Sequence, residues 1–173
     1  LSPEELTQAE CIVNEQIFNN TPVETEVRSM QEAISAGAMA LFGEKYGDRV
    51  RVVAVPGFSL ELCGGIHVRA TGDIGPFIIV AEGGIAAGVR RIEAMTGAAA
   101  VAHVQTQRRA VERILGRLNV AAGPRDMNLP GLDLHQLQGA RKGTWVVEVS
   151  GNWRLTFSFS GKDVERVDYD DYH

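Results

Sequence analysis

The sequence predicts an α+β fold, in which a glycine-rich antiparallel sheet with helices is followed by a long helix packed on a small antiparallel sheet. Three observations predict it. The chain has 173 residues, 45% hydrophobic and 23% charged, which is ordinary for a globular protein of one domain or two small ones. Eight glycines between residues 63 and 97 separate short apolar runs. Between residues 98 and 119 the apolar period becomes that of a helix, and β-rich segments then end the chain.

The first elements are two helices with a strand between them. Ser2-Pro3-Glu4-Glu5 places an N-cap, a proline at the first helical position and a capping-box glutamate in order. Ser29 and Glu32 form a second capping box, for a helix that we expect to end near Gly37. Residues 23–27 alternate apolar or Thr side chains with glutamates, which predicts a half-buried strand.

The later elements follow from turn residues and a change of period. Residues 51–55 predict a strand that Pro56-Gly57 ends, and residues 63–97 predict a meander of short strands. The helix after them carries an apolar stripe, made of Val101, Val104, Val111, Ile114 or Leu115, and Leu118. Three strands close the chain, at about 144–149, 153–159 and 164–169, with Gly151-Asn152 as a hairpin turn.

Charge divides the chain and limits its class. Residues 1–100 hold 7 Lys+Arg and 13 Asp+Glu, whereas residues 101–162 hold 9 and 4. That basic stretch suits contact with phosphate or is ordinary solvated charge, and both readings stay open.

Uncharged runs are too short to span a bilayer, and two cysteines are no disulfide framework, so we expect a cytoplasmic protein without a membrane partner. Because residue 1 is Leu, we expect a processed chain or a piece of something longer.

The run Cys63-Gly64-Gly65-Ile66-His67 places a thiol and an imidazole four residues apart across two glycines. Zinc takes Cys and His ligands in a tetrahedron, and glycines let the backbone fold around the metal. Such a pair is also compatible with chance, and a zinc site needs at least one further protein ligand. The other cysteine, Cys11, is expected to be a buried apolar residue on its helix.

Four longer runs carry a family resemblance, at residues 37–48, 61–65, 71–75 and 88–94. Together they make residues 1–100 resemble the second half of the editing domain of alanyl-tRNA synthetase. That family hydrolyses Ser or Gly wrongly esterified to tRNA(Ala), and its zinc is held by an H-x3-H pair plus the Cys and His of a C-G-G-T-H run. The resemblance implies Cys63 and His67 as two of four zinc ligands, with the tRNA(Ala) acceptor end as partner. The H-x3-H pair would lie upstream of Leu1, and Ile66 replaces the family's Thr.

Arg90 and Arg91 lie in the last of these runs and invite contact with tRNA phosphate. Adjacent residues of a strand face opposite ways, so at most one of the two is expected to face a ligand. A surface or ion-paired arginine is the alternative for each.

The last third holds the residue types that metal-free RNA cleavage needs. That reaction requires a base for the ribose 2′-OH, an acid for the 5′-oxygen leaving group and a cation for the phosphate. His135 and the closing Asp170-Asp171-Tyr172-His173 can supply base and acid, and Arg154 can supply the cation. Spacing alone does not bring them together.

Five runs carry a second resemblance, at residues 126–131, 134–137, 142–145, 151–157 and 167–173. They make residues 107–173 resemble the HigB-type, plasmid-maintenance killer branch of the RelE-like toxins. Such toxins cut mRNA in the ribosomal A site and are neutralised by an antitoxin, so the resemblance implies ribosome-bound mRNA and an antitoxin protein as partners and no cofactor. Gln138 replaces the family's usual Lys, which Arg141 and Lys142 partly compensate. The implied catalytic set is His135, Arg154, Asp171, Tyr172 and His173.

We therefore expect two incomplete domains: a partial alanyl-tRNA synthetase editing-type domain over residues 1–100 and a partial HigB/RelE-like toxin domain over residues 101–173. The predicted function is a fragment or fusion that joins an aminoacyl-tRNA deacylase part, with zinc at Cys63 and His67, to an RNA-cleaving part. Two alternatives stay open, a HigB-like ribosome-dependent mRNA endoribonuclease of a toxin–antitoxin system and a non-catalytic remnant or binding module. The enzyme class is accordingly aminoacyl-tRNA deacylase or metal-independent endoribonuclease, and a gene fusion, a generated sequence or a mis-joined fragment each fits as the origin.

Overall fold

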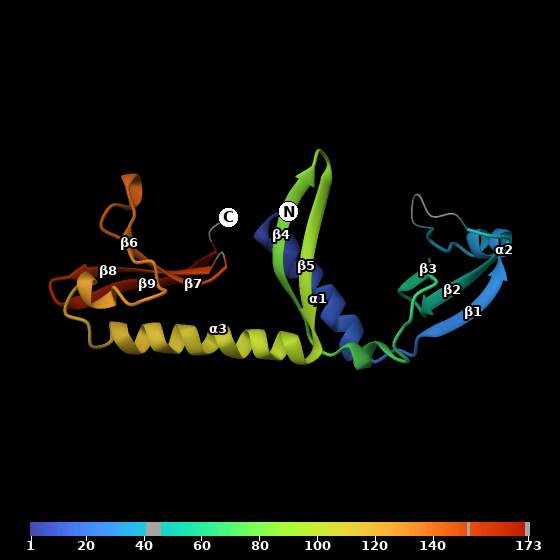
Figure 1. Cartoon of the computed structure of the whole chain (residues 1–173), viewed down its shortest axis with the longest axis horizontal. Helices are drawn as coiled ribbons and strands as arrows, with labels where there is room; N and C mark the ends of the chain where they lie inside the picture. Colours follow the sequence, from blue (N-terminus) through green and yellow to red (C-terminus); the bar gives the residue numbers. More distant parts are fainter. Residues whose placement is uncertain (41–45, 152, 172–173) are drawn as a thin grey trace. The chain divides into compact units, whose positions relative to one another are not determined.

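The fold is α+β, as the sequence predicts, with helices and small antiparallel sheets along one chain (Figure 1). The structure is a computed structural model that describes residues 1–40, 46–151 and 153–171, with the side chain of residue 171 excepted. It divides into two compact units, Leu1–Ala100 and Val101–His173, and each is described by itself. Within the described part of the chain, no helix has the length and apolar character needed to cross a membrane.

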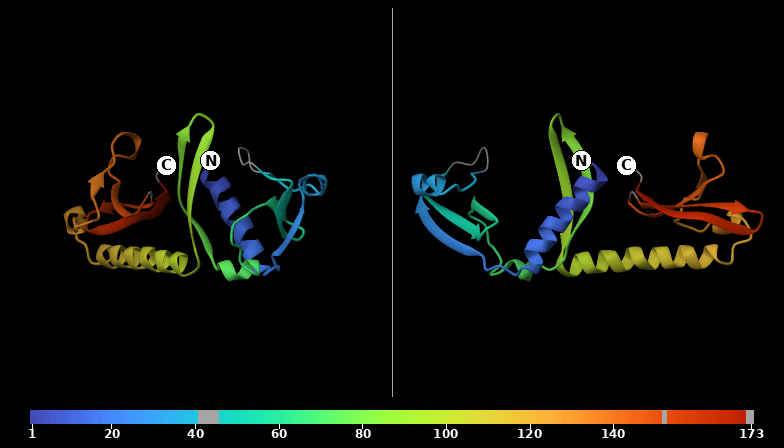
Figure 2. Two further views of the ribbon diagram at one scale, coloured as in Figure 1. Left: turned by 45° about the vertical axis from the view of Figure 1, so that its right-hand side comes forward. Right: turned by 180° about the vertical axis from the view of Figure 1, so that it is seen from behind.

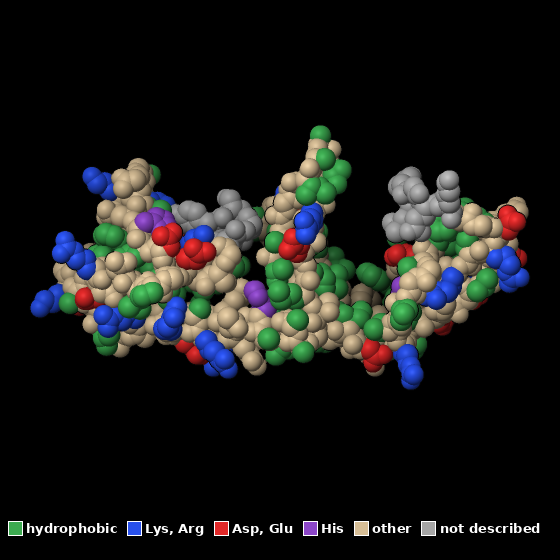
Figure 3. Space-filling view, in the orientation of Figure 1, with side chains coloured by type: hydrophobic (Ala, Val, Ile, Leu, Met, Phe, Trp, Pro, Cys, Tyr) green, Lys and Arg blue, Asp and Glu red, His purple; other side chains and the backbone are tan. Residues whose placement is uncertain are grey.

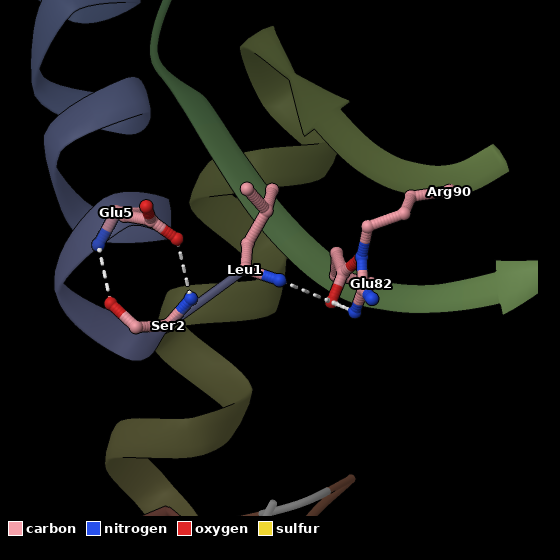
Figure 4. Close-up of polar contacts among 5 residues, drawn as sticks. All are labelled: Leu1, Ser2, Glu5, Glu82 and Arg90. Atoms are coloured by element: carbon pink, nitrogen blue, oxygen red, sulfur yellow. Dashed lines mark hydrogen bonds and ion pairs between the residues drawn. The ribbon is translucent and has the colours of Figure 1, made fainter. Parts of the chain in front are cut away.

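The first unit begins with helix α1, Pro3–Phe18. The predicted capping box is confirmed: the Glu5 backbone N–H donates to Ser2 Oγ at 3.3 Å, and the Ser2 N–H donates to the Glu5 carboxylate at 2.8 Å (Figure 4). The helix turns Glu10 and Asn14 toward strand β4 and buries Ile17 near its end. Cys11 is offset from that face and is exposed, so its expected burial is wrong.

A three-stranded antiparallel sheet follows, and helix α2 lies between its first two strands along the chain. Helix α2 has the predicted Ser29–Glu32 capping box, and Gly37 follows it at a φ of 87°, which ends it where the sequence predicts. Ala33 of α2 packs with Val50, Val52 and Leu62 of the sheet to form the core of this half. The elements, in sheet order β1-β2-β3, are β1 (Glu24–Ser29), β2 (Arg49–Val55) and β3 (Ser59–Leu62), with α2 at Met30–Ser35.

Strand β1 forms as predicted, but the expected half-burial is wrong. Its Val27 side chain is 55% exposed, and Thr25 is exposed as well. The register pairs Val27 with Arg51, whereas Val50 and Val52, which face α2, pair with Arg28 and Glu26. Residues directly opposite each other share a face of the sheet, so Val27 lies on the face away from α2.

The glycine-rich stretch forms one long hairpin instead of the predicted meander of short strands. Residues 63–70 form no strand, and a short 3-10 turn, η1 (Thr71–Ile74), leads into β4 (Phe77–Ala86) and β5 (Val89–Thr96). Gly83 and Gly84 lie inside β4, and the reversal occurs at Gly88, which has a φ of 73°. Figure 2 shows this hairpin from two further sides, with α1 against it.

The second unit packs a helix against a four-stranded antiparallel sheet of order β6-β7-β8-β9. The three predicted closing strands are confirmed, and a short strand β6 is added at the edge. Asn152, half of the predicted hairpin turn, lies outside the described residues. Helix α3 (Gly97–Leu118) begins in the last residues of the first unit and continues into the second. The other elements are η2 (Pro124–Met127), β6 (His135–Gln136), η3 (Gly139–Arg141), β7 (Trp145–Ser150), β8 (Trp153–Ser160) and β9 (Asp163–Asp171).

Only the C-terminal half of the predicted apolar stripe of α3 packs in the core. Ile114 is fully buried while Leu115 is 42% exposed, so Ile114 is the one of these two residues that belongs to the packed face of the helix. Val101 and Val104 are 45% and 48% exposed, and the expectation of one continuous packed stripe is wrong there. The core of this unit consists of Ile114, Leu118, Ala121, Met127, Leu132, Val147, Leu155 and Phe157.

Candidate functional site

The sheet of the second unit carries a polar row on the face opposite α3. Val147 and Leu155 face the helix core, so their neighbours Glu148 and Arg154 face the other way. The register places Glu148 opposite Arg154, and Arg154 opposite Asp170. The three side chains therefore share one face, on three successive strands.

Arg154, a predicted catalytic residue, is held on this face by contacts with nearby residues. Its Nη1 donates to the carbonyl oxygens of Gly151 at 2.6 Å and Trp153 at 3.1 Å. The same nitrogen lies 3.6 Å from a carboxylate oxygen of Glu148. The Arg154 side chain is 22% exposed, so part of it is accessible to solvent.

His135, the predicted base, lies on β6 at the edge of the same face. His135 lies opposite Val146 of β7, which lies opposite Thr156 of β8, so the three residues share one face of the sheet. Its Nδ1 lies 2.8 Å from the Asp133 carbonyl oxygen. In neutral imidazole this bond assigns the proton to Nδ1 and leaves Nε2 as a proton acceptor. The ring is exposed, so Nε2 can serve as a base toward an external ligand.

Sequence reasoning missed a second polar cluster beside Arg154. Asp170 accepts a hydrogen bond from Arg141 Nη2 at 2.7 Å and lies 3.5 Å from the Thr156 hydroxyl, which is 1% exposed as a residue. Arg141 appears in the sequence only as a compensation for Gln138, and Thr156 as an ordinary strand residue. The alternation of β8 is the signal that finds Thr156, because it lies two residues after Arg154.

The remaining predicted catalytic residues are at the end of the chain. Asp171 ends β9 and pairs through its backbone with Trp153, and Tyr172 and His173 lie outside the described residues. The Trp153 ring stacks on Tyr169, with 4.7 Å between ring centroids, and Trp145 packs against the core. Both tryptophans thus pack on the sheet.

In the first unit, the candidate zinc ligands Cys63 and His67 lie around one glycine. Two hydrogen bonds with Arg51 hold the Cys63 backbone. The Cys63 N–H donates to the Arg51 carbonyl oxygen, and Arg51 Nε donates to the Cys63 carbonyl oxygen, both at 3.1 Å. The Gly65 N–H donates to Cys63 Sγ at 3.4 Å. A Cβ placed on Gly65 would lie 3.5 Å from Cys63 Sγ and 3.9 Å from His67 Nε2, so both donor atoms approach the same point.

A thiol and an imidazole are the donor set that zinc prefers, so the pair fits that metal. Among the residues that the structure describes, no cluster brings three or more His, Cys, Asp or Glu side chains together for a metal. The pair by itself supplies two donors, and a zinc ion would need further protein ligands.

Arg90 and Arg91 are both ion-paired, Arg90 with Glu82 and Arg91 with Glu93. Arg90 forms a two-pronged contact with the Glu82 carboxylate, which also lies 3.9 Å from the Leu1 amino group (Figure 4). The hydrogen bonds that Arg90 donates to the Glu82 carboxylate raise the pKa of its guanidinium above the ordinary value. Of the two predicted alternatives for these arginines, the ion-paired one describes the free chain.

Comparison with protein families gives two matches along the chain. Residues 50–93 match the family described as the threonyl and alanyl tRNA synthetase second additional domain. Residues 100–173 match the family described as the RelE-like toxin HigB of type II toxin–antitoxin systems. Both resemblances predicted from the sequence motifs are confirmed, and the second match includes most of α3.

Curated relatives of the chain are alanine–tRNA ligases. Those of Solibacter usitatus and Idiomarina loihiensis are 56% and 55% identical over 117 and 118 residues, which is 68% of this chain and 13% and 14% of theirs. That of Aromatoleum aromaticum is 47% identical over 180 residues, 95% of this chain and 20% of its own. The chain thus spans a fifth or less of these relatives. Alignments this long do not fit within residues 1–100, so they extend into the region that matches the toxin family.

Proposed function

We propose that the chain is a fusion of two RNA-directed modules and that its second unit is an RNA-cleaving module of the HigB type. The observation that carries the proposal is the shared sheet face of the second unit. It carries His135 on β6 and Arg154 on β8, with strand β7 between them, on the side away from the helix core. The match of residues 100–173 to the HigB family supports the same assignment.

The chemistry follows from what these groups can do. His135 Nε2 takes the proton of a ribose 2′-OH, and the 2′-oxygen then attacks the adjacent phosphorus. Arg154 stabilises the negative charge that builds up on the phosphate. The bond to the 5′-oxygen breaks, and that oxygen receives a proton from the terminal set Asp171, Tyr172 and His173. The products are a 2′,3′-cyclic phosphate and a free 5′-OH, so the reaction consumes no water in this step.

The partners that follow are ribosome-bound mRNA and an antitoxin protein. Induction of the chain in bacteria tests the proposal, with growth and total protein synthesis as readouts. We expect growth arrest from the parent chain and its relief by His135→Ala. His103→Ala is the matched control, because His103 lies on α3 in the same unit, where it contacts Gln107. Continued growth under the parent chain, or equal arrest by His135→Ala, would overturn the proposal.

A second candidate function is the zinc-assisted hydrolysis of mischarged Ser- or Gly-tRNA(Ala). It is favoured by the convergence of Cys63 Sγ and His67 Nε2 near Gly65. Cys63 and His67 would hold the metal together with ligands from another segment or chain, and bound zinc would polarise the ester carbonyl or its attacking water. Metal analysis of the purified chain tests it, because a chain that retains no stoichiometric zinc does not edit by itself.

A further inference from the structure

One edge of the β4–β5 hairpin has no partner strand among the residues that the structure describes. Strand β5 pairs only with β4 there, whereas the other edge of β4 contacts α1 through Asn14 and Glu10. An unpaired edge presents backbone N–H and C=O groups that can bind another extended chain. Figure 3 shows hydrophobic side chains on this hairpin, with basic and acidic side chains among them. The open edge of β5 is therefore a candidate interaction surface.

The register shows which backbone groups of β5 point outward. The Gly97 N–H donates to the Pro76 carbonyl oxygen at 3.0 Å, whereas the backbone of Phe77, the next residue, bonds to α1 on the opposite side. Backbone groups alternate in direction along a strand, and both register shifts of the hairpin insert the extra residue in β4, so β5 alternates without interruption. The N–H and C=O groups that point away from β4 are those of Arg90, Ile92 and Ala94.

We propose that β5 pairs with the β5 strand of a second copy of this chain, antiparallel and about a twofold axis through Ile92. Ile92 then lies opposite its own counterpart, and Arg91 lies opposite Glu93 of the other copy. Val89 lies opposite Met95 in the same way. The outward groups form about six backbone hydrogen bonds across the axis. Two hairpins thereby become one four-stranded antiparallel sheet, and the pairing requires neither proposed function.

The side chains of β5 match themselves in this register. Val89 and Ile92, which are 48% and 46% exposed, each gain an apolar partner. Arg91 and Glu93, which are 65% and 50% exposed and 2.8 Å apart within the chain, each face an opposite charge across the axis. The two neighbouring registers that keep the same backbone groups in contact place Arg91 or Glu93 opposite itself, and like charges directly opposite are unfavourable. Charge complementarity therefore selects a second copy, paired about Ile92.

Sedimentation equilibrium of the purified full chain tests the pairing. Two eight-residue strands form a small interface, so we expect a reversible dimer whose fraction rises between about 1 μM and 1 mM chain. Arg91→Glu and Glu93→Arg should each weaken the dimer by about tenfold, because each places like charges opposite one another. An equal mixture of these two variants should associate again, because every charged contact across the axis is then between opposite signs.

Arg28→Glu is the matched control for charge. It removes the ion pair that Arg28 forms with Glu26 on β1, an exposed pair two residues apart like that of β5. We expect it to leave self-association unchanged. A dimer that Arg28→Glu dissociates, or a mixture of the two β5 variants that stays monomeric, would overturn the inference.

Disulfide trapping in a Cys11→Ser background tests the register. Ile92→Cys places two thiols on the axis, where Cα atoms of opposed residues lie about 5.5 Å apart, within the span of a disulfide. Ala94→Cys is the control, on the same face but four residues along the strand from its counterpart, roughly 13 Å. A covalent dimer of the Ile92→Cys variant, and none of the Ala94→Cys variant, supports the pairing. Equal cross-linking of both variants contradicts the register, and a chain that is monomeric at every concentration overturns the inference and leaves the edge to a different partner.

Discussion

The side-chain amide of Asn14 pairs with the backbone of Phe77 as a neighbouring strand would. Asn14 Nδ2 donates to the Phe77 carbonyl oxygen at 2.8 Å, and the Phe77 N–H donates to Asn14 Oδ1 at 2.9 Å. One turn earlier, Glu10 accepts from the Ile79 N–H at 2.8 Å. Among the described residues β4 pairs only with β5, and helix α1 thereby satisfies backbone groups of β4 on its other edge.

Asn14→Leu should therefore destabilise the first unit. The substitution leaves the N–H and C=O of Phe77 unsatisfied in a partly buried place, at a cost of about 1–3 kcal/mol in the free energy of unfolding. Urea denaturation followed by far-UV circular dichroism measures the change. Gln8→Leu, at an exposed position of the same helix, is the control and should have little effect. An Asn14→Leu variant as stable as the parent would contradict this role.

Capping and turn residues predicted local structure well. The features that they did not predict depend on the register between strands that are distant in the sequence. Both capping boxes act between residues three apart, so the sequence contains all that they need. The burial of Val27 depends on pairing with a strand beyond an inserted helix, which local alternation does not encode. Motifs located Arg154 and His135 in the sequence. The Arg141–Asp170 pair could not be located in this way, because it joins η3 to strand β9, 29 residues further along the chain.

The Ser29–Glu32 box predicts a pH dependence of helix α2. Hydrogen bonds from the Ser29 side chain and backbone lower the pKa of Glu32 below its ordinary value. A lowered pKa means that the ionised carboxylate is favoured in the folded chain. Its contribution is complete above the pKa of an unfolded glutamate and is lost as pH falls through the lowered pKa. Ser29→Ala should return the pKa of Glu32 toward its ordinary value in an NMR titration, whereas Thr25→Ala should not.

We expect the two units to unfold separately. Both tryptophans, Trp145 and Trp153, lie in the second unit, so tryptophan fluorescence reports that unit alone. Phe157 is fully buried there, and Phe157→Ala should cost about 3–5 kcal/mol and lower the denaturation midpoint seen by fluorescence. Val52→Ala, in the core of the first unit, should lower the circular dichroism midpoint only. A shift of the fluorescence midpoint by Val52→Ala would show one cooperative fold instead.

Metal binding at the first unit should depend on one cysteine and not on the other. Cobalt(II) substitutes for zinc and gives a thiolate charge-transfer band when a cysteine coordinates it. We expect that band on titration of the chain with Co²⁺, its loss in Cys63→Ser and its weakening in His67→Ala. Cys11→Ser is the matched control, because Cys11 is exposed on α1 and belongs to no candidate site. A band that Cys11→Ser removes, or that Cys63→Ser leaves intact, excludes the assignment.

The central claim, that the second unit cleaves RNA through a ribose 2′-OH, is tested most directly with a modified message. Purified chain is mixed with ribosomes that hold an mRNA in the A site, either all-ribose or with one 2′-deoxynucleotide on the 5′ side of the scissile bond. We predict rapid cleavage of the first message and none of the second, with His135→Ala slowing the first by about 10²–10⁴-fold, as expected for loss of a general base. Equal cleavage of both messages, or no cleavage of the all-ribose message, would contradict the account.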